Sequence, residues 1–243
     1  NDTFNPSILF YKDKWLAENF EVNLYQSLNS LFKGLNQENK YKDYDYVGFG
    51  SSNFNFSKDY KYLESAEKEI QEASKKFSSY KTYLNENFNE NNVLNSELEE
   101  KVIHFATHND FIQNDENLLI PALVTNMPID EKDGYLDTFE ISTLNLSNSL
   151  VILSACETSK SINQDSDSFS GLVKSFKVAG ARDIVATRWI IETSSANVFI
   201  EKYLDYLKTG KSSSGSIFAA KKEFINSQQY SHPYYWASYF NVN

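Results

Sequence analysis

The chain changes repeatedly from short apolar runs to longer segments whose apolar residues recur at helical spacing. The runs lack alternation, which is typical of strands buried on both faces of a parallel sheet. The longer segments carry charged residues opposite an apolar stripe. The runs occupy residues 46–50, 102–108, 150–153 and 182–189, and the helical segments occupy residues 62–77, 171–180, 194–207 and 212–224. Because strands and helices alternate, we predict an α/β fold with a mostly parallel central sheet and helices on both faces.

Some segments between these elements have mixed patterns. Residues 85–92 indicate an Asn-rich loop, and residues 93–98 a short helix. The run at residues 118–124 is apolar, but Pro121 has no backbone N–H to donate, so we place this run at a sheet edge or a bulge. Residues 234–240 are rich in aromatic side chains and predict a strand close to the end of the sequence.

The only cysteine in the sequence stands at the end of one predicted strand. Cys156 follows the run at residues 150–153, where apolar residues give way to a polar loop. His108 closes the run at residues 102–108 in the same way. If these two strands are neighbours, their carboxyl ends meet at one edge of the sheet, and the two side chains can come together. A histidine beside a cysteine can take the thiol proton and make the sulfur a nucleophile.

Two other interpretations of the sequence remain open, one for the cysteine and one for residues 46–50. A lone cysteine after a buried strand is by default an inert core residue, and the local caspase signature around the cysteine is absent. The strand at residues 46–50 contains Gly48 and Gly50, which suggests a nucleotide-binding loop. That pattern lacks the third glycine and the immediate helix of the dinucleotide fingerprint, so the signal is weak.

Composition narrows the function classes. The formal net charge of −10 argues against a nucleic-acid-binding surface, which needs clustered Lys and Arg. One cysteine excludes an internal disulfide and a cysteine-based zinc site, and we expect neither metal nor cofactor. The sequence has no apolar run of membrane-spanning length and no signal-peptide pattern, so we expect a cytoplasmic protein without a membrane partner. We expect one domain over residues 1–243.

Several motifs occur in one order along the chain. They are the L-x-x-A-x-x-E-I pattern at residues 63–70, residues 104–108, Asp133-Gly134 with Glu140-Ile141, residues 153–158, Gly171-Leu172, residues 179–181 with Trp189, and residues 232–237. With these motifs the chain resembles the CHAT domain, the caspase-like and separase-like group of bacterial cysteine peptidases. The resemblance runs from about residue 15 to the last residue, and it implies a caspase-like three-layer sandwich.

The resemblance also implies roles for individual residues. Cys156 would be the nucleophile of a cysteine endopeptidase, and His108 its general base and acid. The backbone N–H groups of Cys156 and Asn109 would stabilise the oxyanion. Ser154, two residues before the cysteine, and Arg188, after the neighbouring strand, are candidates for the substrate pocket. The other two histidines, His104 and His232, are expected to be structural.

The resemblance implies a protein substrate and a regulatory or sensor domain or partner protein, in a bacterial signalling or defence pathway. Family members usually begin with a further strand that is not visible before Asn1, so the chain is expected to belong to a longer protein. They also usually have glycine after the catalytic histidine, where this chain has Asn109. That departure motivates an alternative function, an inactive scaffold that keeps the fold and binds a protein partner.

Overall fold

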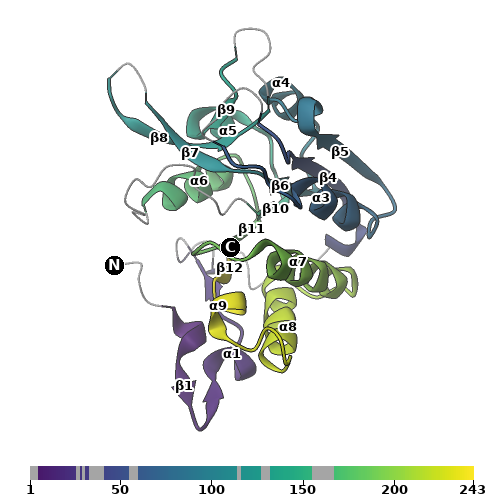
Figure 1. The fold of residues 1–243 in the computed structure, drawn as a ribbon, viewed down its shortest axis with the longest axis vertical. Helices are drawn as coiled ribbons and strands as arrows, with labels where there is room; N and C mark the ends of the chain where they lie inside the picture. The colour runs from purple at the N-terminus through teal and green to yellow at the C-terminus, as the bar shows by residue number, and fades with distance from the viewer. Residues whose placement is uncertain are drawn as a thin grey trace. The chain divides into compact units, whose positions relative to one another are not determined.

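The computed structural model describes residues 5–25, 28, 31–32, 41–54, 60–113, 116–126, 132–154 and 167–243, with side chains from residue 171 in the last range. The chain divides into two compact units. We call Asp45–Arg182 the middle unit, and Asn1–Tyr44 with Asp183–Asn243 the terminal unit. Figure 1 shows the helices and strands of both units. No helix among the described residues is both long enough and apolar enough to cross a bilayer.

The middle unit is built on four parallel strands. In sheet order they are β10 (Leu150–Leu153), β6 (Lys101–Ala106), β4 (Asp45–Gly50) and β5 (Tyr80–Leu84). All four residues of β10 are buried, as are five of the six residues of β4 and of β6. These uninterrupted buried runs are the ones in which the sequence shows no alternation. The prediction of a parallel sheet buried on both faces is therefore confirmed for these strands.

Helix α3 (Ala66–Ser74) packs on this sheet, and its apolar stripe faces the core. Ala66, Ile70 and Ala73 are buried, as the periodicity predicts. The other helices of the unit are η3 (Asn85–Asn87), α4 (Glu90–Leu94), α5 (Thr138–Thr143) and α6 (Asp167–Val178). The loop predicted at residues 85–92 is thus wrong in part, because Asn89 accepts the Asn92 backbone N–H and starts α4 earlier than expected.

A second sheet in the middle unit follows directly on β6. Its antiparallel strands are β7 (Asn109–Gln113), β8 (Leu119–Val124) and β9 (Tyr135–Asp137), with β8 in the centre. The edge position predicted from Pro121 is therefore wrong for the strand as a whole. It is correct locally, since Pro121 pairs with Phe111 of β7, whereas β9 pairs only with the last three residues of β8. The missing N–H of proline falls where β8 has one neighbour.

The two glycines of β4 have a packing role. A Cβ atom on Gly48 would lie 2.5 Å from Ile70 Cγ2, and one on Gly50 would lie 2.8 Å from Ile70 Cγ1. Both glycines let α3 approach the strand closely, and α3 does not begin until Ala66. The nucleotide-binding interpretation of residues 46–50 therefore loses its support.

Gly48→Ala is expected to destabilise the protein, because the added methyl group overlaps Ile70 and the Tyr46 ring, 2.8 Å away. Overpacking of this kind costs about 1–3 kcal/mol. Chemical denaturation measures the loss. Because the closest clash is with Ile70, Gly48→Ala combined with Ile70→Ala should be less destabilised than the sum of the two single changes. Strict additivity, or no effect of Gly48→Ala, would contradict the packing role.

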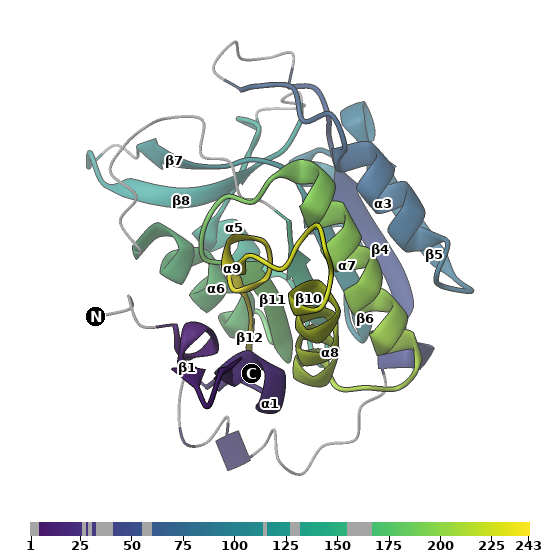
Figure 2. The same ribbon diagram turned by 60° about the horizontal axis from the view of Figure 1, so that its bottom comes forward.

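In the terminal unit, β12 (Tyr239–Val242) is the central strand of three paired strands. It pairs antiparallel with β11 (Asp183–Thr187) and parallel with β3 (Asn23–Leu24). The long helices α7 (Thr193–Lys208) and α8 (Ser213–Ile225) pack side by side (Figure 2). The smaller elements are η1 (Pro6–Ile8), β1 (Phe10–Tyr11), β2 (Lys14–Trp15), α1 (Leu16–Asn19), η2 (Tyr41–Asp43) and α9 (Pro233–Trp236).

The strand predicted at residues 234–240 is wrong in its first half. Pro233 begins α9, and the side chain of His232 caps this helix by accepting the Tyr234 backbone N–H at 3.2 Å. Proline suits the first helical position because its missing donor would have no partner there. Only from Tyr239 does the chain continue as a strand.

Candidate active site

The two strands that carry the predicted dyad are neighbours. β6 and β10 pair in parallel with Leu153 opposite Phe105, and the Ser154 backbone N–H donates to Phe105 O at 2.8 Å. His108 comes three residues after Phe105, and Cys156 comes three residues after Leu153. Residues 155–166, and with them Cys156, lie outside the described residues. The neighbouring strands are therefore confirmed, while the meeting of thiol and imidazole stays a prediction.

His108 is buried just beyond the end of β6. Its side chain is part of an aromatic cluster, with ring centroids 5.0 Å from Phe54 and 5.5 Å from Tyr60. Its Nε2 atom lies 2.8 Å from the backbone oxygen of Lys61. A carbonyl oxygen only accepts, so Nε2 must carry a proton, and in the neutral ring the basic lone pair is on Nδ1. One backbone oxygen thereby selects the tautomer of His108.

The backbone around His108 is held by β8. The His108 carbonyl accepts the Val124 backbone N–H at 2.9 Å, and the Thr107 hydroxyl donates to the Val124 carbonyl. Asn109 lies opposite Leu123 in the ladder, and the bond between Val124 and His108 lies next to this pair. In an antiparallel ladder this makes Asn109 and Leu123 a pair whose backbone groups do not bond to each other. The N–H of Asn109 therefore points away from β8.

Asn109 is the residue that replaces the usual glycine. It is the first residue of β7, in extended backbone that any residue adopts, so its side chain causes no backbone strain. Its Oδ1 atom is buried and has no hydrogen-bond partner among the described residues. Leaving a polar atom in this state costs about 1–3 kcal/mol.

A buried carboxylate follows closely after the histidine. Asp110 is on β7 and is 5% exposed. One of its oxygens accepts the hydroxyl of Tyr60 at 2.8 Å, and the other accepts the Phe111 backbone N–H at 2.8 Å. Neither Asp110 nor Tyr60 is among the site residues predicted from the sequence. The signal was weak, because a strand that begins with Asn and Asp does not resemble a buried one.

The other two histidines have structural surroundings. His104 is fully buried, with Nδ1 2.9 Å from the Tyr46 hydroxyl and Nε2 2.9 Å from Glu69 Oε1 of α3. His232 caps α9. Both therefore have the structural role expected of them.

The two predicted pocket residues lie in different units. Ser154 is half-buried directly after β10. Arg188 directly follows β11, where its guanidinium lies 5.1 Å from the ring centroid of Phe240 and its backbone N–H donates to Ser238 O at 3.1 Å. The ring contact gives Arg188 a packing role, and a role in substrate binding stays a prediction for both residues.

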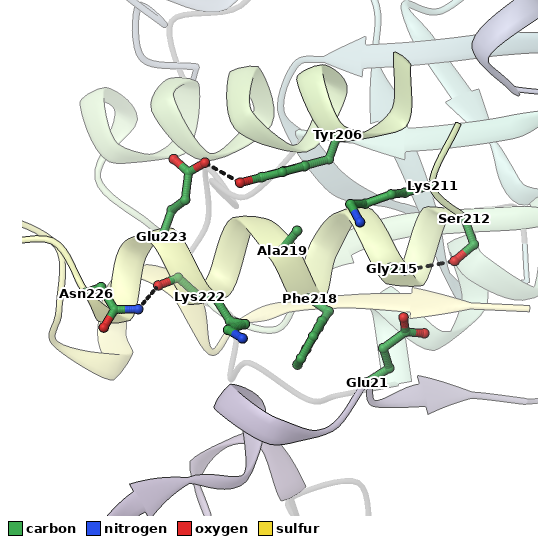
Figure 3. A pocket seen from close by; sticks show the side chains of 10 residues that line it. All are labelled: Glu21, Tyr206, Lys211, Ser212, Gly215, Phe218, Ala219, Lys222, Glu223 and Asn226. Atoms are coloured by element: carbon green, nitrogen blue, oxygen red, sulfur yellow. Dashed lines mark hydrogen bonds between the residues drawn. The ribbon is translucent and has the colours of Figure 1, made fainter. Parts of the chain in front are cut away.

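A cavity of about 760 Å³ lies along α8 in the terminal unit (Figure 3). Polar groups in its lining pair with one another or with the backbone. Tyr206 donates its hydroxyl proton to Glu223, and Asn226 donates to the backbone oxygen of Lys222 at 2.7 Å. Neither cysteine nor histidine is among the residues that line it. The lining of this cavity therefore offers no cysteine–histidine pair.

Comparison with known proteins places the chain in a family. The sequence profile of the CHAT domain matches residues 3–242. Tetratricopeptide repeat protein 28 is 27% identical over 104 residues in Mus musculus and over 107 residues in Homo sapiens. These matches cover 43% and 44% of this chain but only 4% of each relative.

A solved structure resembles this chain in fold. The crystal structure of the Arg-specific cysteine proteinase gingipain R aligns with a TM-score of 0.52 and 9% identity, covering 86% of this chain and 48% of that one. At this identity the likeness shows the fold alone. It confirms the predicted fold class, α/β with a mostly parallel sheet and a caspase-like arrangement. The chain belongs to the CHAT domain family and has the fold of caspase-like cysteine proteases.

Proposed function

We propose that this chain is a cysteine endopeptidase in which Cys156 is the nucleophile and His108 is its base. The observation that carries the proposal is the pairing of β6 with β10 at Phe105 and Leu153, because both residues of the dyad follow that pair by the same number of positions. The hydrogen bond from Nε2 to Lys61 O supports it further, since it leaves the lone pair on Nδ1.

The first half of the reaction forms a thioester. Nδ1 of His108 takes the thiol proton of Cys156, and the sulfur attacks the carbonyl carbon of the scissile peptide bond. The backbone N–H groups of Asn109 and Cys156 stabilise the negative oxygen that forms. When this intermediate collapses, the carbon–nitrogen bond breaks, and the leaving amine takes the proton from Nδ1.

The second half of the reaction releases the new carboxyl end. Nδ1 takes a proton from a water molecule as the water oxygen attacks the thioester carbon. The carbon–sulfur bond then breaks, and the proton returns to the thiolate, so the thiol is restored. The Lys61 carbonyl accepts from Nε2 throughout and stabilises the imidazolium that forms in each half.

Substrate selection and regulation extend the proposal. The substrate is a protein, and Ser154 contributes to the pocket for the residue before the scissile bond. Most of each repeat-protein relative lies outside the region that matches this chain, which favours a sensing or regulatory domain or partner. We place this activity in the cytoplasm, in a bacterial signalling or defence pathway, with low activity until the partner engages.

A second candidate function is a catalytically inactive scaffold that binds a protein partner. Asn109 favours it, because its side chain stands where the family usually has none and brings a buried oxygen without a partner among the described residues. The backbone N–H that the oxyanion needs is nevertheless kept, and points away from β8. The peptidase therefore remains the better-supported function.

A thiol-reactive probe built on a short peptide distinguishes these functions. We expect it to label the unsubstituted protein at Cys156, and labelling should disappear in Cys156→Ala and fall at least about 100-fold in His108→Ala. His232→Ala is the matched control, since this histidine caps α9, and it should label normally. Mass spectrometry of the labelled peptide is the measurement. Equal labelling of His108→Ala would exclude the dyad, and an unreactive Cys156 in the folded protein would favour the scaffold.

A further inference from the structure

Tyr60 contacts the candidate base through its ring. The Tyr60 and His108 planes are inclined by 29° at a centroid distance of 5.5 Å, and Tyr60 belongs to a buried apolar cluster with Phe54 and Val124. The next residue, Lys61, supplies the carbonyl that accepts from His108 Nε2. Two successive residues therefore contact the imidazole, Tyr60 with its ring and Lys61 with its backbone oxygen.

The far end of the Tyr60 ring is tied to a carboxylate. Its hydroxyl donates to Asp110 Oδ2 at 2.8 Å, and the Tyr135 hydroxyl lies 2.8 Å from the same phenol oxygen. A hydroxyl has one proton, so Tyr60 accepts from Tyr135 while it donates to Asp110. Burial, and then the hydrogen bonds to Tyr135 and Asp110, raise the pKa of Tyr60 far above its ordinary value. The phenol therefore keeps its proton and remains a donor.

Asp110 is itself held in place. Besides the phenol it accepts the Phe111 backbone N–H at 2.8 Å, and Asp110 pairs with Ala122 in the ladder between β7 and β8. The carboxylate thus has a fixed position on a strand whose first residue follows His108 directly. A hydrogen bond to an ionised acceptor is about twice as strong as one between neutral groups.

We infer that Tyr60 and Asp110 are positioning residues for His108. The carboxylate anchors the phenol, and the phenol ring holds the imidazole plane so that Nδ1 faces the reacting proton. The catalytic consequence rests on the proposed function, whereas the placement of the imidazole does not. Without its anchor the Tyr60 ring keeps its apolar contacts but can shift along the imidazole. Proton transfer depends on alignment, so this shift lowers kcat and leaves KM nearly unchanged.

Tyr60→Phe tests the anchor, because it removes the hydroxyl and keeps the ring. We expect kcat to fall about tenfold, with KM within about twofold. Asp110→Asn should have a similar effect. The two carboxylate oxygens of Asp110 accept separately from Tyr60 and Phe111, and the asparagine amide has only one oxygen. The kcat of the double variant should be little lower than that of either single variant, because both substitutions break the same chain of contacts. The matched control is Tyr41→Phe, whose buried hydroxyl donates to Asp183 in the terminal unit. It should keep kcat despite a comparable loss of stability.

An NMR readout in the Cys156→Ala background separates the two proposals. The His108 Nε2–H proton, bonded to Lys61 O, should give a slowly exchanging resonance in this background and with Tyr41→Phe added. With Tyr60→Phe or Asp110→Asn added, it should exchange at least about tenfold faster or broaden away. An unchanged resonance in Tyr60→Phe overturns the inference. If the resonance is lost while Cys156 proves unreactive in the unsubstituted protein, the positioning role stands and the peptidase does not.

Discussion

Replacing Cys156 with alanine is expected to abolish peptide hydrolysis, with a fall in kcat/KM of at least about 10⁴-fold. The thioester route then has no nucleophile, and water attack without it is far slower. The kcat/KM of His108→Ala should fall by a comparable factor, because the thiol is left without the group that takes its proton. The measurement is kcat/KM on a peptide that the unsubstituted protein cleaves.

The double variant distinguishes a dyad from two independent residues. Since nucleophile and base act in one step, Cys156→Ala with His108→Ala should be no slower than the worse of the two single variants. His232→Ala serves as the control and should hydrolyse the peptide at the unsubstituted rate. A His108→Ala variant that keeps its rate within about tenfold would remove the base from the mechanism.

Lys221→Met is expected to stabilise the protein at neutral pH and to flatten its dependence on pH. Lys221 is on α8 and 5% exposed, with its ammonium nitrogen 3.0 Å from Ser7 Oγ. Burial, and then the positive charge of Arg188, lower the pKa of Lys221 from 10.5 to about 7. Methionine has a similar shape and no charge to desolvate.

The sign of the pH effect follows from proton binding. Between pH 7 and 10.5 the unfolded chain holds the Lys221 proton and the folded chain does not, so stability rises with pH across this window. Across this window, Lys221 raises the free energy of unfolding by on the order of 4 kcal/mol at most. Lys221→Met should remove that rise, as measured by chemical denaturation at several pH values. Lys222→Met, on the exposed face of the same helix, is the control. An unchanged rise in Lys221→Met would contradict the buried, neutral amine.

The sequence predicts the parts of the fold that depend on local pattern. The runs that form β4, β6 and β10 are mostly apolar and lack alternation, because both faces of these strands are covered. The sequence places a histidine and a cysteine each beyond a strand end, and the pairing of β6 with β10 meets the condition under which the two can come together.

The contacts that shape the candidate site could not be predicted in this way. Asp110 is polar by sequence, and one of the groups that satisfy its buried carboxyl is the hydroxyl of Tyr60, 50 residues earlier in the chain. Lys61 contributes a backbone oxygen, which leaves no trace in residue type. Pro121 suggested an edge strand, because the short partner on one side of β8 cannot be inferred from a local pattern. Each of these features depends on pairing between distant segments.

The distance between His108 Nδ1 and Cys156 Sγ in a crystal structure of this chain tests the central claim most directly. We predict that the two atoms lie within about 4 Å of each other, or reach that separation by one change of side-chain rotamer, while Nε2 stays on the Lys61 carbonyl. A sulfur enclosed by aliphatic side chains, with Nδ1 facing elsewhere and no rotamer that brings the two together, would contradict the dyad and the peptidase built on it.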